Sequence, residues 1–504
     1  MASESEGLEH NAIGLTEVLF QSITHMAPAV AVALSIGFAT TLALGITPLA
    51  VLLALIAVLF TAYSIGELAR HLPSAGGMYT YVGKGIGSYA GWLVAWAFLL
   101  AEPIVPPLLF AAFGFYGATL LNELFGISND FLWVPLAVLC ALIVWFLTYR
   151  GISLSTRTGV VLGSIEIVIF LVVSALLVIN AGSRNTLSVF VPGADGIKPA
   201  LQGMVFCLLA FVGFEAAAPL AEETRDPKRT IRRAVLWSAV LIGAFYVFCY
   251  YAATVYFGPD KMADFIGANG GNPWGGMADQ VLPNIGGYLV VIAILNSCLA
   301  NANAGANAST RAMFSLGRSR LLPGAMAAIH PTHRTPVNAV HVQAVIGIVI
   351  AVGLGLWFGS AYPSTPGPLN VYFVLGYALG LLFAGMYMAV NLAVIGYYYR
   401  FARAEFNPIK HVLVPVVGVI LMIPAFVSAS PGGVTIPIID LPITPLAEPY
   451  SFAPIVVAIW MVVGIVIGVL LWLTRREALA TVADAMGETD AVASAGEQPM
   501  PTPA

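Results

Sequence analysis

Residues 209–233 read Leu209-Ala-Phe-Val-Gly-Phe-Glu-Ala-Ala-Ala-Pro-Leu-Ala-Glu-Glu-Thr-Arg-Asp-Pro-Lys-Arg-Thr-Ile-Arg-Arg233, and they decide the fold. An apolar helix is interrupted near its middle by Gly213, between Phe211 and Phe214, and Glu215 follows. A dense basic loop comes next. Membrane helices seldom carry an acid at mid-bilayer unless it lines a cavity, forms a pair or acts on a transported solute. The stretch therefore predicts a transport site inside a membrane protein.

Composition places the chain in a bilayer. Of its 504 residues, 59% are hydrophobic and 9% are charged, and the mean hydropathy is +0.90, whereas a soluble domain carries about 25% charged residues. A soluble enzyme could not cover so much apolar surface with so few charges, so the lipid bilayer is the expected surrounding partner. The net charge of −4 gives no sign of nucleic acid as a partner.

The sequence lacks the patterns expected of a cofactor or metal enzyme. No glycine-rich phosphate loop follows a strand, which argues against ATP-driven transport. No dense cluster of histidine, cysteine and aspartate suggests a metal site. We therefore expect no cofactor, no bound metal and no enzymatic activity.

Twelve apolar runs reach about 20 residues, the length needed to cross the hydrocarbon core. Their predicted bounds are 15–42, 46–69, 88–120, 131–149, 158–181, 199–220, 234–256, 284–314, 337–359, 369–399, 411–429 and 452–474. With the N-terminus inside, 18 of the 21 Lys and Arg residues fall inside and three (Arg184, Lys198 and Lys261) fall outside. The positive-inside rule therefore predicts a multi-pass protein of the plasma membrane with both termini in the cytoplasm.

A second interruption falls in the first span, where Ser22-Ile-Thr-His-Met-Ala-Pro-Ala29 lies near mid-membrane. Pro28 cannot donate a backbone hydrogen bond, and Thr24 and His25 add polarity. Spans one and six hold corresponding positions in two five-helix repeats of opposite orientation, and paired interruptions of this kind predict a midplane binding site. Ordinary proline and glycine kinks are the alternative reading.

Interrupted helices offer backbone chemistry to a small molecule. The N-terminal end of a half-helix presents free N–H groups and a positive dipole to an anion such as a carboxylate. The C-terminal end of a half-helix presents carbonyl oxygens to an ammonium group. Two such helices could hold an amino and a carboxyl group with backbone alone.

The blocks around these breaks resemble the amino acid–polyamine–organocation (APC) transporter superfamily. Residues 211–231 resemble its sixth-helix signature, 62–79 the end of its second helix, and 310–323 with 330–336 its eighth-helix exit and the following loop. The resemblance implies an all-α membrane protein with twelve transmembrane helices, in which a leucine-transporter-type 5+5 inverted repeat precedes two extra C-terminal helices. It also implies alternating access for amino acids or related amines.

The resemblance also implies a division of the chain and a set of site residues. The expected parts are a cytoplasmic segment 1–14, a first repeat 15–181, a second repeat 199–399, two final helices within 411–474 and a disordered cytoplasmic tail 475–504. Substrate is expected against the breaks of helices one and six, with helices three, eight and ten contributing. The predicted substrate-binding residues are Ser22, Thr24, Ala27, Pro28, Ala29, Glu102, Ala210, Phe211, Gly213, Phe214 and Asn301.

Two positions depart from the family pattern. Many members have a Gly-Ser-Gly type loop at the first break, where this chain has Ala27, Pro28 and Ala29, so fewer backbone N–H groups are free. Some proton-coupled members place a lysine in helix five, where this chain has no lysine and its interior acid is Glu166. The family's coupling mechanism therefore does not transfer directly.

Ionisable residues at depth are the candidates for coupling and gating. Glu102, about halfway across span three, can bind a cationic amine or relay a proton. Glu215 and Glu166 are candidate proton carriers, and His25 beside the first break belongs to the residue type that titrates near neutral pH. Each has a structural alternative as a polar contact between helices. The charged residues 222–226 are predicted to form a solvated cytoplasmic latch.

These features predict a secondary active transporter of amino acids or small amines, in its leading form an importer with the proton as coupling ion. An exchanger of amino acids or amines is the alternative. A channel or a membrane-embedded enzyme is a remote one, because the polar residues gather at two breaks instead of lining a continuous path. No feature of the sequence specifies which substrate is carried or which oligomer forms.

Overall fold

The computed structural model describes residues 8–193, 196–428, 434–436, 441–443 and 446–474. Among these residues, nine helical stretches are long and apolar enough to cross a membrane, and the first of them, Leu15–Ala69, contains predicted spans one and two. The shorter apolar helices Trp133–Tyr149 and Lys198–Ala210 correspond to predicted spans four and six. The all-α membrane class is confirmed, while the predicted tail 475–504 lies outside the described residues.

The α-helices follow one another along the whole chain. Their bounds are α1 Leu15–His25, α2 Pro28–Val30, α3 Ile36–Ala43, α4 Thr47–Ala69, α5 Met78–Gly85, α6 Ser88–Phe125, α7 Trp133–Tyr149, α8 Ile152–Ala181, α9 Lys198–Ala210, α10 Pro227–Phe257, α11 Pro273–Val281, α12 Gly286–Arg318, α13 Val337–Ala361, α14 Gly367–Arg400, α15 Val414–Val427 and α16 Phe452–Thr474. Strands β1 Val434–Ile436 and β2 Leu441–Ile443 form an antiparallel pair that pairs Val434 with Ile443.

Short 3₁₀ and π segments join these helices. The 3₁₀ segments are η2 Leu44–Ile46, η3 Gly182–Arg184, η4 Leu187–Phe190, η5 Ala218–Glu223, η6 Pro259–Gly271, η7 Gly324–Ala327 and η8 Arg403–Glu405. The π-helical turns are η1 Ala31–Ser35 and η9 Ile409–Leu413. The turn η1 continues α2 into α3, so that the second half of the first span is a single irregular helix.

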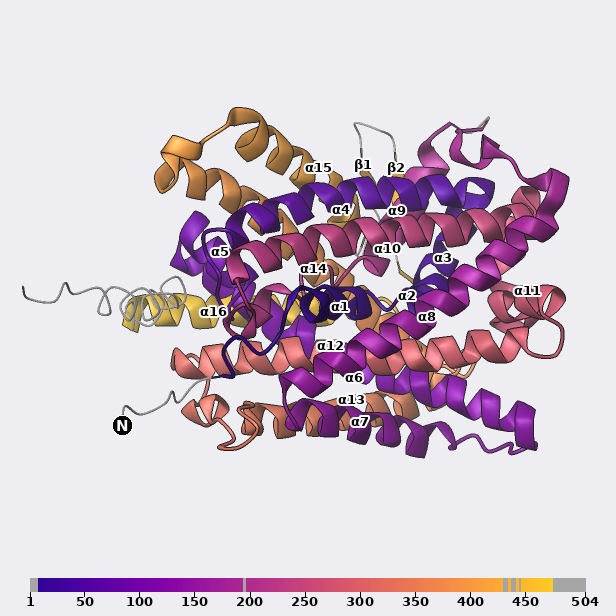
Figure 1. Cartoon of the computed structure of the whole chain (residues 1–504), viewed down its shortest axis with the longest axis horizontal. Helices are drawn as coiled ribbons and strands as arrows, with labels where there is room; N and C mark the ends of the chain where they lie inside the picture. The colour runs from indigo at the N-terminus through magenta and orange to yellow at the C-terminus, as the bar shows by residue number, and fades with distance from the viewer. Residues whose placement is uncertain (1–7, 194–195, 429–433, 437–440, 444–445, 475–504) are drawn as a thin grey trace, which may run out of the picture.

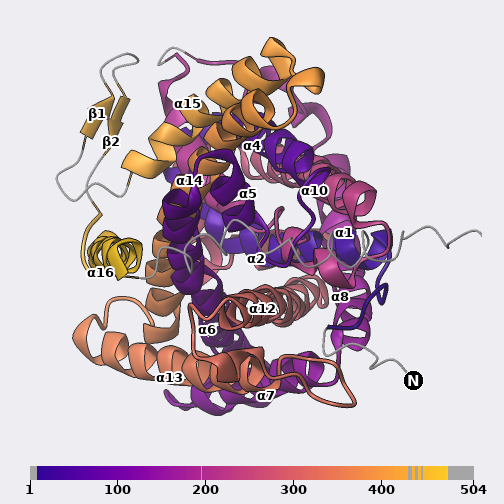
Figure 2. The same cartoon turned by 90° about the vertical axis from the view of Figure 1, so that its left-hand side faces the viewer.

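Long helices surround the first span on several sides. Most of them run roughly along the long axis of the molecule (Figure 1). Seen from the end, α2 lies in the middle and α1 lies beside it towards one edge, with α4 and α10 to one side and α12 and α6 to the other (Figure 2). Helix α16 and the β1–β2 ribbon lie at the periphery in the same view. The two interrupted segments are therefore shielded from lipid by uninterrupted helices.

Helix α6 stays continuous although Pro103, Pro106 and Pro107 lie inside it. Proline removes a backbone donor, so it leaves a carbonyl of the preceding turn without its usual partner. Membrane helices tolerate this where a neighbouring helix supplies the missing bond. Here the side-chain Nε2 of Gln343 on α13 donates to the Pro103 carbonyl at 3.1 Å.

Candidate functional site

Both predicted interruptions are confirmed. Helix α1 ends at His25, and Ala27 has φ +48°, a left-handed conformation that a helix cannot continue through. Pro28 then begins α2, a position where its missing N–H costs nothing. Helix α9 ends at Ala210, residues 211–217 form turns, and Gly213 has φ +117°. Glycine adopts that conformation at no steric cost, which explains its place there.

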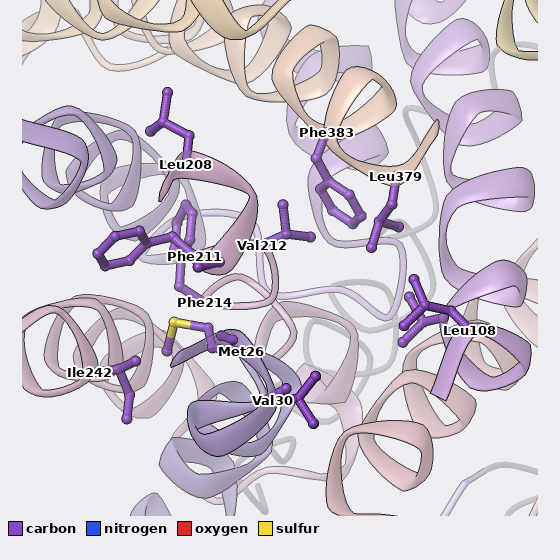
Figure 3. Packing of buried hydrophobic residues seen from close by; sticks show 14 of the residues in the cluster. Met26, Val30, Leu108, Leu208, Phe211, Val212, Phe214, Ile242, Leu379 and Phe383 are labelled. Carbon is purple, nitrogen blue, oxygen red and sulfur yellow. The ribbon is translucent and has the colours of Figure 1, made fainter. Parts of the chain in front are cut away.

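The two breaks meet at the centre of the molecule. A Cβ added to Gly213 would lie 2.7 Å from the carbonyl carbon of His25, so the two backbones are in direct contact. The Tyr246 hydroxyl lies 2.7 Å from the carbonyl oxygen of Met26 and 3.0 Å from that of Ala210, joining the ends of both half-helices. Figure 3 shows Met26 of the first break lying close to Phe214 of the second.

A cavity of about 60 Å³ lies beside the paired breaks. Four of the predicted site residues line it: His25, Ala27, Ala210 and Asn301. Helices α6 and α14 add apolar side chains, and Leu108 and Leu379 face Val212 across the space (Figure 3). A largely apolar hollow with a few polar groups is the usual form of a small-molecule site.

Several residues that line the cavity were not predicted from the sequence. From α14 they are Tyr372, Gly376 and Tyr377, and from α6 they are Leu108 and Leu109. The Tyr372 hydroxyl lies 3.0 Å from Ser35 Oγ, which ties α14 to the first span. The available signal was the pair of tyrosines inside the apolar run of predicted span ten, because a tyrosine hydroxyl within a helix bundle normally finds a partner.

Other predicted residues lie behind the wall. The Ser22 hydroxyl accepts the N–H of Ala217 at 3.1 Å, so it fastens one break to the other. Thr24 donates to Phe20 within its own helix at 2.7 Å. The rings of Phe211 and Phe214 are fully buried, with centroids 5.3 Å from Tyr246 and 5.1 Å from Tyr387 respectively.

The expected free N–H groups at the start of the second half-helix are already bonded. Pro28 has none, the Ala29 N–H donates to Glu166 Oε2 at 2.9 Å, and the Val30 N–H donates to Ser297 Oγ at 3.3 Å. A carboxylate from α8 thus takes the place that we expected for a substrate carboxylate. The first N–H groups of α2 are therefore not free for a substrate carboxyl group in this conformation.

Glu215 closes the second break in a similar way. Its Oε2 accepts the N–H of Gly213 at 3.2 Å and the hydroxyl of Tyr387 at 2.6 Å. The residue is 1% exposed, and Oε1 has no hydrogen-bond partner among the described residues. Glu215 therefore connects the sixth span to α14 through one oxygen and leaves the other available.

His25 links the cavity to Glu102. Its Nε2 lies 3.4 Å from Glu102 Oε2, within ion-pair distance but outside hydrogen-bond geometry. Glu102 is fully buried, and in the described part of the chain neither of its carboxylate oxygens has a hydrogen-bond partner. Glu102 does not line the cavity, whereas His25 does. The negative charge of Glu102 therefore acts on the cavity by way of its contact with His25.

The charged segment that was predicted to act as a solvated latch forms two ion pairs, and the first of them is buried. Arg311 on α12 makes two bonds to Glu223, at 3.0 and 3.1 Å, and the two side chains are 0% and 1% exposed. The segment before α1 covers this pair, because the Ile13 N–H donates to the Glu223 carbonyl and the Arg225 N–H donates to the Ile13 carbonyl. Glu222 and Arg318 form a second, more exposed pair at 2.8 Å.

Known proteins similar to this chain are transporters. A family model described as amino acid permease matches residues 13–462. The low-affinity putrescine importer PlaP of Escherichia coli K12 is 29% identical over 67% of this chain and 74% of its own length. Two Bacillus subtilis proteins are each 24% identical over 57% of this chain: the branched-chain amino acid permease BcaP, over 63% of its length, and the serine/threonine exchanger SteT, over 64%.

Proposed function

The chain belongs to the amino acid permease family, and from that premise we propose that it imports a small organic amine without exporting another solute. Members of this family carry amino acids or amines across membranes and are not enzymes. The inward movement of a proton drives the import. Substrate binds in the cavity beside the two helix breaks and moves by alternating access. The residues predicted from the sequence form the wall of this site and the layer directly behind it.

The bond from the Ala29 N–H to Glu166 supports an amine as substrate. With that donor occupied, the start of α2 offers no free N–H group to a carboxylate in this state. The cavity wall carries an acceptor instead, since Asn301 Oδ1 has no hydrogen-bond partner within the described residues. An ammonium group has three donors and no acceptor, so it can donate to this oxygen, which a carboxylate cannot do. PlaP, named as a putrescine importer, is a relative with such a substrate.

Three buried acids around the breaks support proton coupling. Glu102, Glu166 and Glu215 each have at least one carboxylate oxygen without a hydrogen-bond partner in the described structure. A carboxylate in a low-dielectric interior is costly unless it is paired or protonated. A proton that neutralises one of these groups in step with substrate binding would couple the two movements.

We place the protein in the plasma membrane with both termini in the cytoplasm, on the strength of the basic residues that gather at one side. The two inverted repeats are assigned to 15–181 and 199–399, followed by the two helices within 411–474. SteT, named as an exchanger, makes antiport the second candidate. Proteoliposomes separate the two modes: an importer takes up labelled amine under an imposed proton gradient with no internal substrate, whereas an exchanger needs internal substrate and no gradient.

Glu166→Gln and Glu215→Gln should each flatten the dependence of uptake on external pH. The parent is expected to take up more substrate as the external pH falls, because protons then enter down a steeper gradient. Glutamine keeps an oxygen that can accept the Ala29 or Gly213 N–H but cannot carry the proton. Initial uptake rates measured at several external pH values provide the test. Parental pH profiles in both variants, or sodium dependence of the parent, would contradict proton coupling through these acids.

Glu102→Gln should weaken binding of cationic substrates by about tenfold, equivalent to about 1.4 kcal/mol, and affect neutral amino acids less. The carboxylate faces His25 at 3.4 Å, and His25 lines the cavity. Competition of diamines, monoamines and amino acids against labelled substrate gives the affinities. An equal loss for both classes would assign Glu102 to folding or proton transfer, and a failure of both diamines and monoamines to compete would refute the proposed substrate class.

A further inference from the structure

A strongly basic cavity lies away from the transport site, where α4 ends and α10 begins. Its volume is about 470 Å³, and its wall is formed by Arg70, Lys228, Arg229, Arg232, Arg233, Leu236 and Trp237. Five of these seven side chains are cationic and none is acidic. Clusters of Lys and Arg at the end of a membrane helix are a typical site for anionic lipid headgroups.

Most of this positive charge is not neutralised by the protein. Glu67 lies 3.2 Å from Arg70 and 2.8 Å from Arg232, and Arg70 also pairs with Glu405 at 2.9 Å, so two carboxylates serve two of the five cations. Within the described residues, no carboxylate oxygen lies within 4.0 Å of the basic groups of Lys228, Arg229 or Arg233. The cavity therefore presents several free cationic donors to an external anion, and arginine matches a phosphate group with paired N–H donors.

An apolar stripe on α10 continues directly from the basic cavity. Arg229, Arg233, Trp237 and Leu241 follow one another at four-residue spacing, which puts them on one face of the helix. Trp237 is 56% exposed and Leu241 is 48% exposed. Tryptophan favours the level of the lipid headgroups. Along this face, cationic residues are followed by an aromatic residue and then by an aliphatic one. The same order holds along a phospholipid, from the charged headgroup through the interface to the acyl chain.

We propose that this cavity binds the phosphate of an anionic phospholipid, whose acyl chains lie along Trp237 and Leu241. Arg229 and Arg233 bind the phosphate, and Glu67 holds Arg70 and Arg232 in place beside it. A free phosphate ion would use the basic part alone. The apolar continuation of the same helix face favours the lipid.

Lipid retention by the purified full-length protein tests the proposal. Detergent-solubilised protein is exposed to equal amounts of phosphatidylglycerol and phosphatidylcholine, and bound lipid is counted by native mass spectrometry. The parent should retain phosphatidylglycerol preferentially, and Arg229→Gln/Arg233→Gln should lose about tenfold of that preference. Arg150→Gln/Arg157→Gln is the matched control, because it removes two exposed cations that lie near the start of another membrane helix, α8. Equal losses in the control, or no preference in the parent, would overturn the proposal.

Two further arms separate a lipid from a soluble anion. Trp237→Ala should weaken retention of phosphatidylglycerol although every cation remains. Inorganic phosphate at millimolar concentration should fail to displace the lipid. Unchanged retention in Trp237→Ala together with displacement by phosphate would identify a phosphate site and refute the lipid site. The unfolding temperatures of all variants show whether a loss of bound lipid reflects weaker binding or poorer folding. Lipid retention is measured without transport, so it tests the lipid site even if the proposed transport function is wrong.

Discussion

Uptake through a Gly213→Val variant is expected to fall to background. Gly213 has φ +117°, where a residue with a side chain is strained by about 1–3 kcal/mol. Its added Cβ would also lie 2.7 Å from the carbonyl carbon and Cδ2 of His25 and 2.8 Å from the His25 oxygen. Two of these three atoms are backbone, so the first break itself would have to move. The measurement is initial uptake in proteoliposomes containing equal amounts of parent and variant protein.

Gly353→Val provides the control for this prediction. Gly353 lies within α13, and an added Cβ there meets nothing within 4 Å. That variant should transport at the parental rate. Gly213→Ala should already lose most activity, because the contact is made by the Cβ atom itself. Parental uptake by Gly213→Val would show that the two breaks need not touch during transport.

The interruptions themselves were predictable because their causes are local. Pro28 lacks an N–H, and Gly213 permits a backbone conformation that other residues avoid. The matched depth of the two positions in spans one and six then implied that they face each other. The contact between Gly213 and His25 agrees with that implication. Composition was enough to place the chain in a bilayer, while the all-α class rested on the lengths of the apolar runs and on the family resemblance.

The hydrogen bonds that the backbone makes at the two interruptions were not predictable, because their partners lie far away in the chain. Glu166 is 137 positions from Ala29, and Ser297 is 267 positions from Val30. The sequence showed Glu166 as an isolated acid in span five with no indication of its partner. The packing of α8 and α12 against the first span brings these groups to its N–H donors. For the same reason, the sequence did not predict that Tyr372 lines the cavity.

The sequence showed the run of charged residues 222–226, but it gave no sign that Glu223 within this run is buried. A run of charged residues after a helix usually lies in solvent, and Arg225 and Asp226 are exposed as expected. Glu223 is buried because the chain before α1 folds over it and bonds to its backbone at Ile13. The segment that covers Glu223 comes from about 210 residues earlier in the sequence, so no local pattern predicts the contact.

Arg311→Gln is expected to cost most of the uptake and to lower the unfolding temperature strongly. Removing one partner of a buried ion pair leaves an uncompensated charge, which costs about 3–5 kcal/mol. Glu223 would be that charge, since its side chain is 1% exposed and both of its oxygens bond Arg311. The same contact joins η5 to α12, so its loss should also loosen the packing between these two segments. Thermal unfolding and uptake of the purified variant are the measurements.

Two matched variants decide whether burial of the charge is the reason. Arg318→Gln breaks the neighbouring pair with Glu222, where the arginine side chain is 36% exposed, and an exposed pair is worth about 0.2–1 kcal/mol. Its effect should therefore be small. Glu223→Gln/Arg311→Gln removes both charges and should recover part of the stability that Arg311→Gln loses. A double variant as unstable as the single one, or equal losses from Arg311→Gln and Arg318→Gln, would mean that burial of an uncompensated charge is not the reason for the loss.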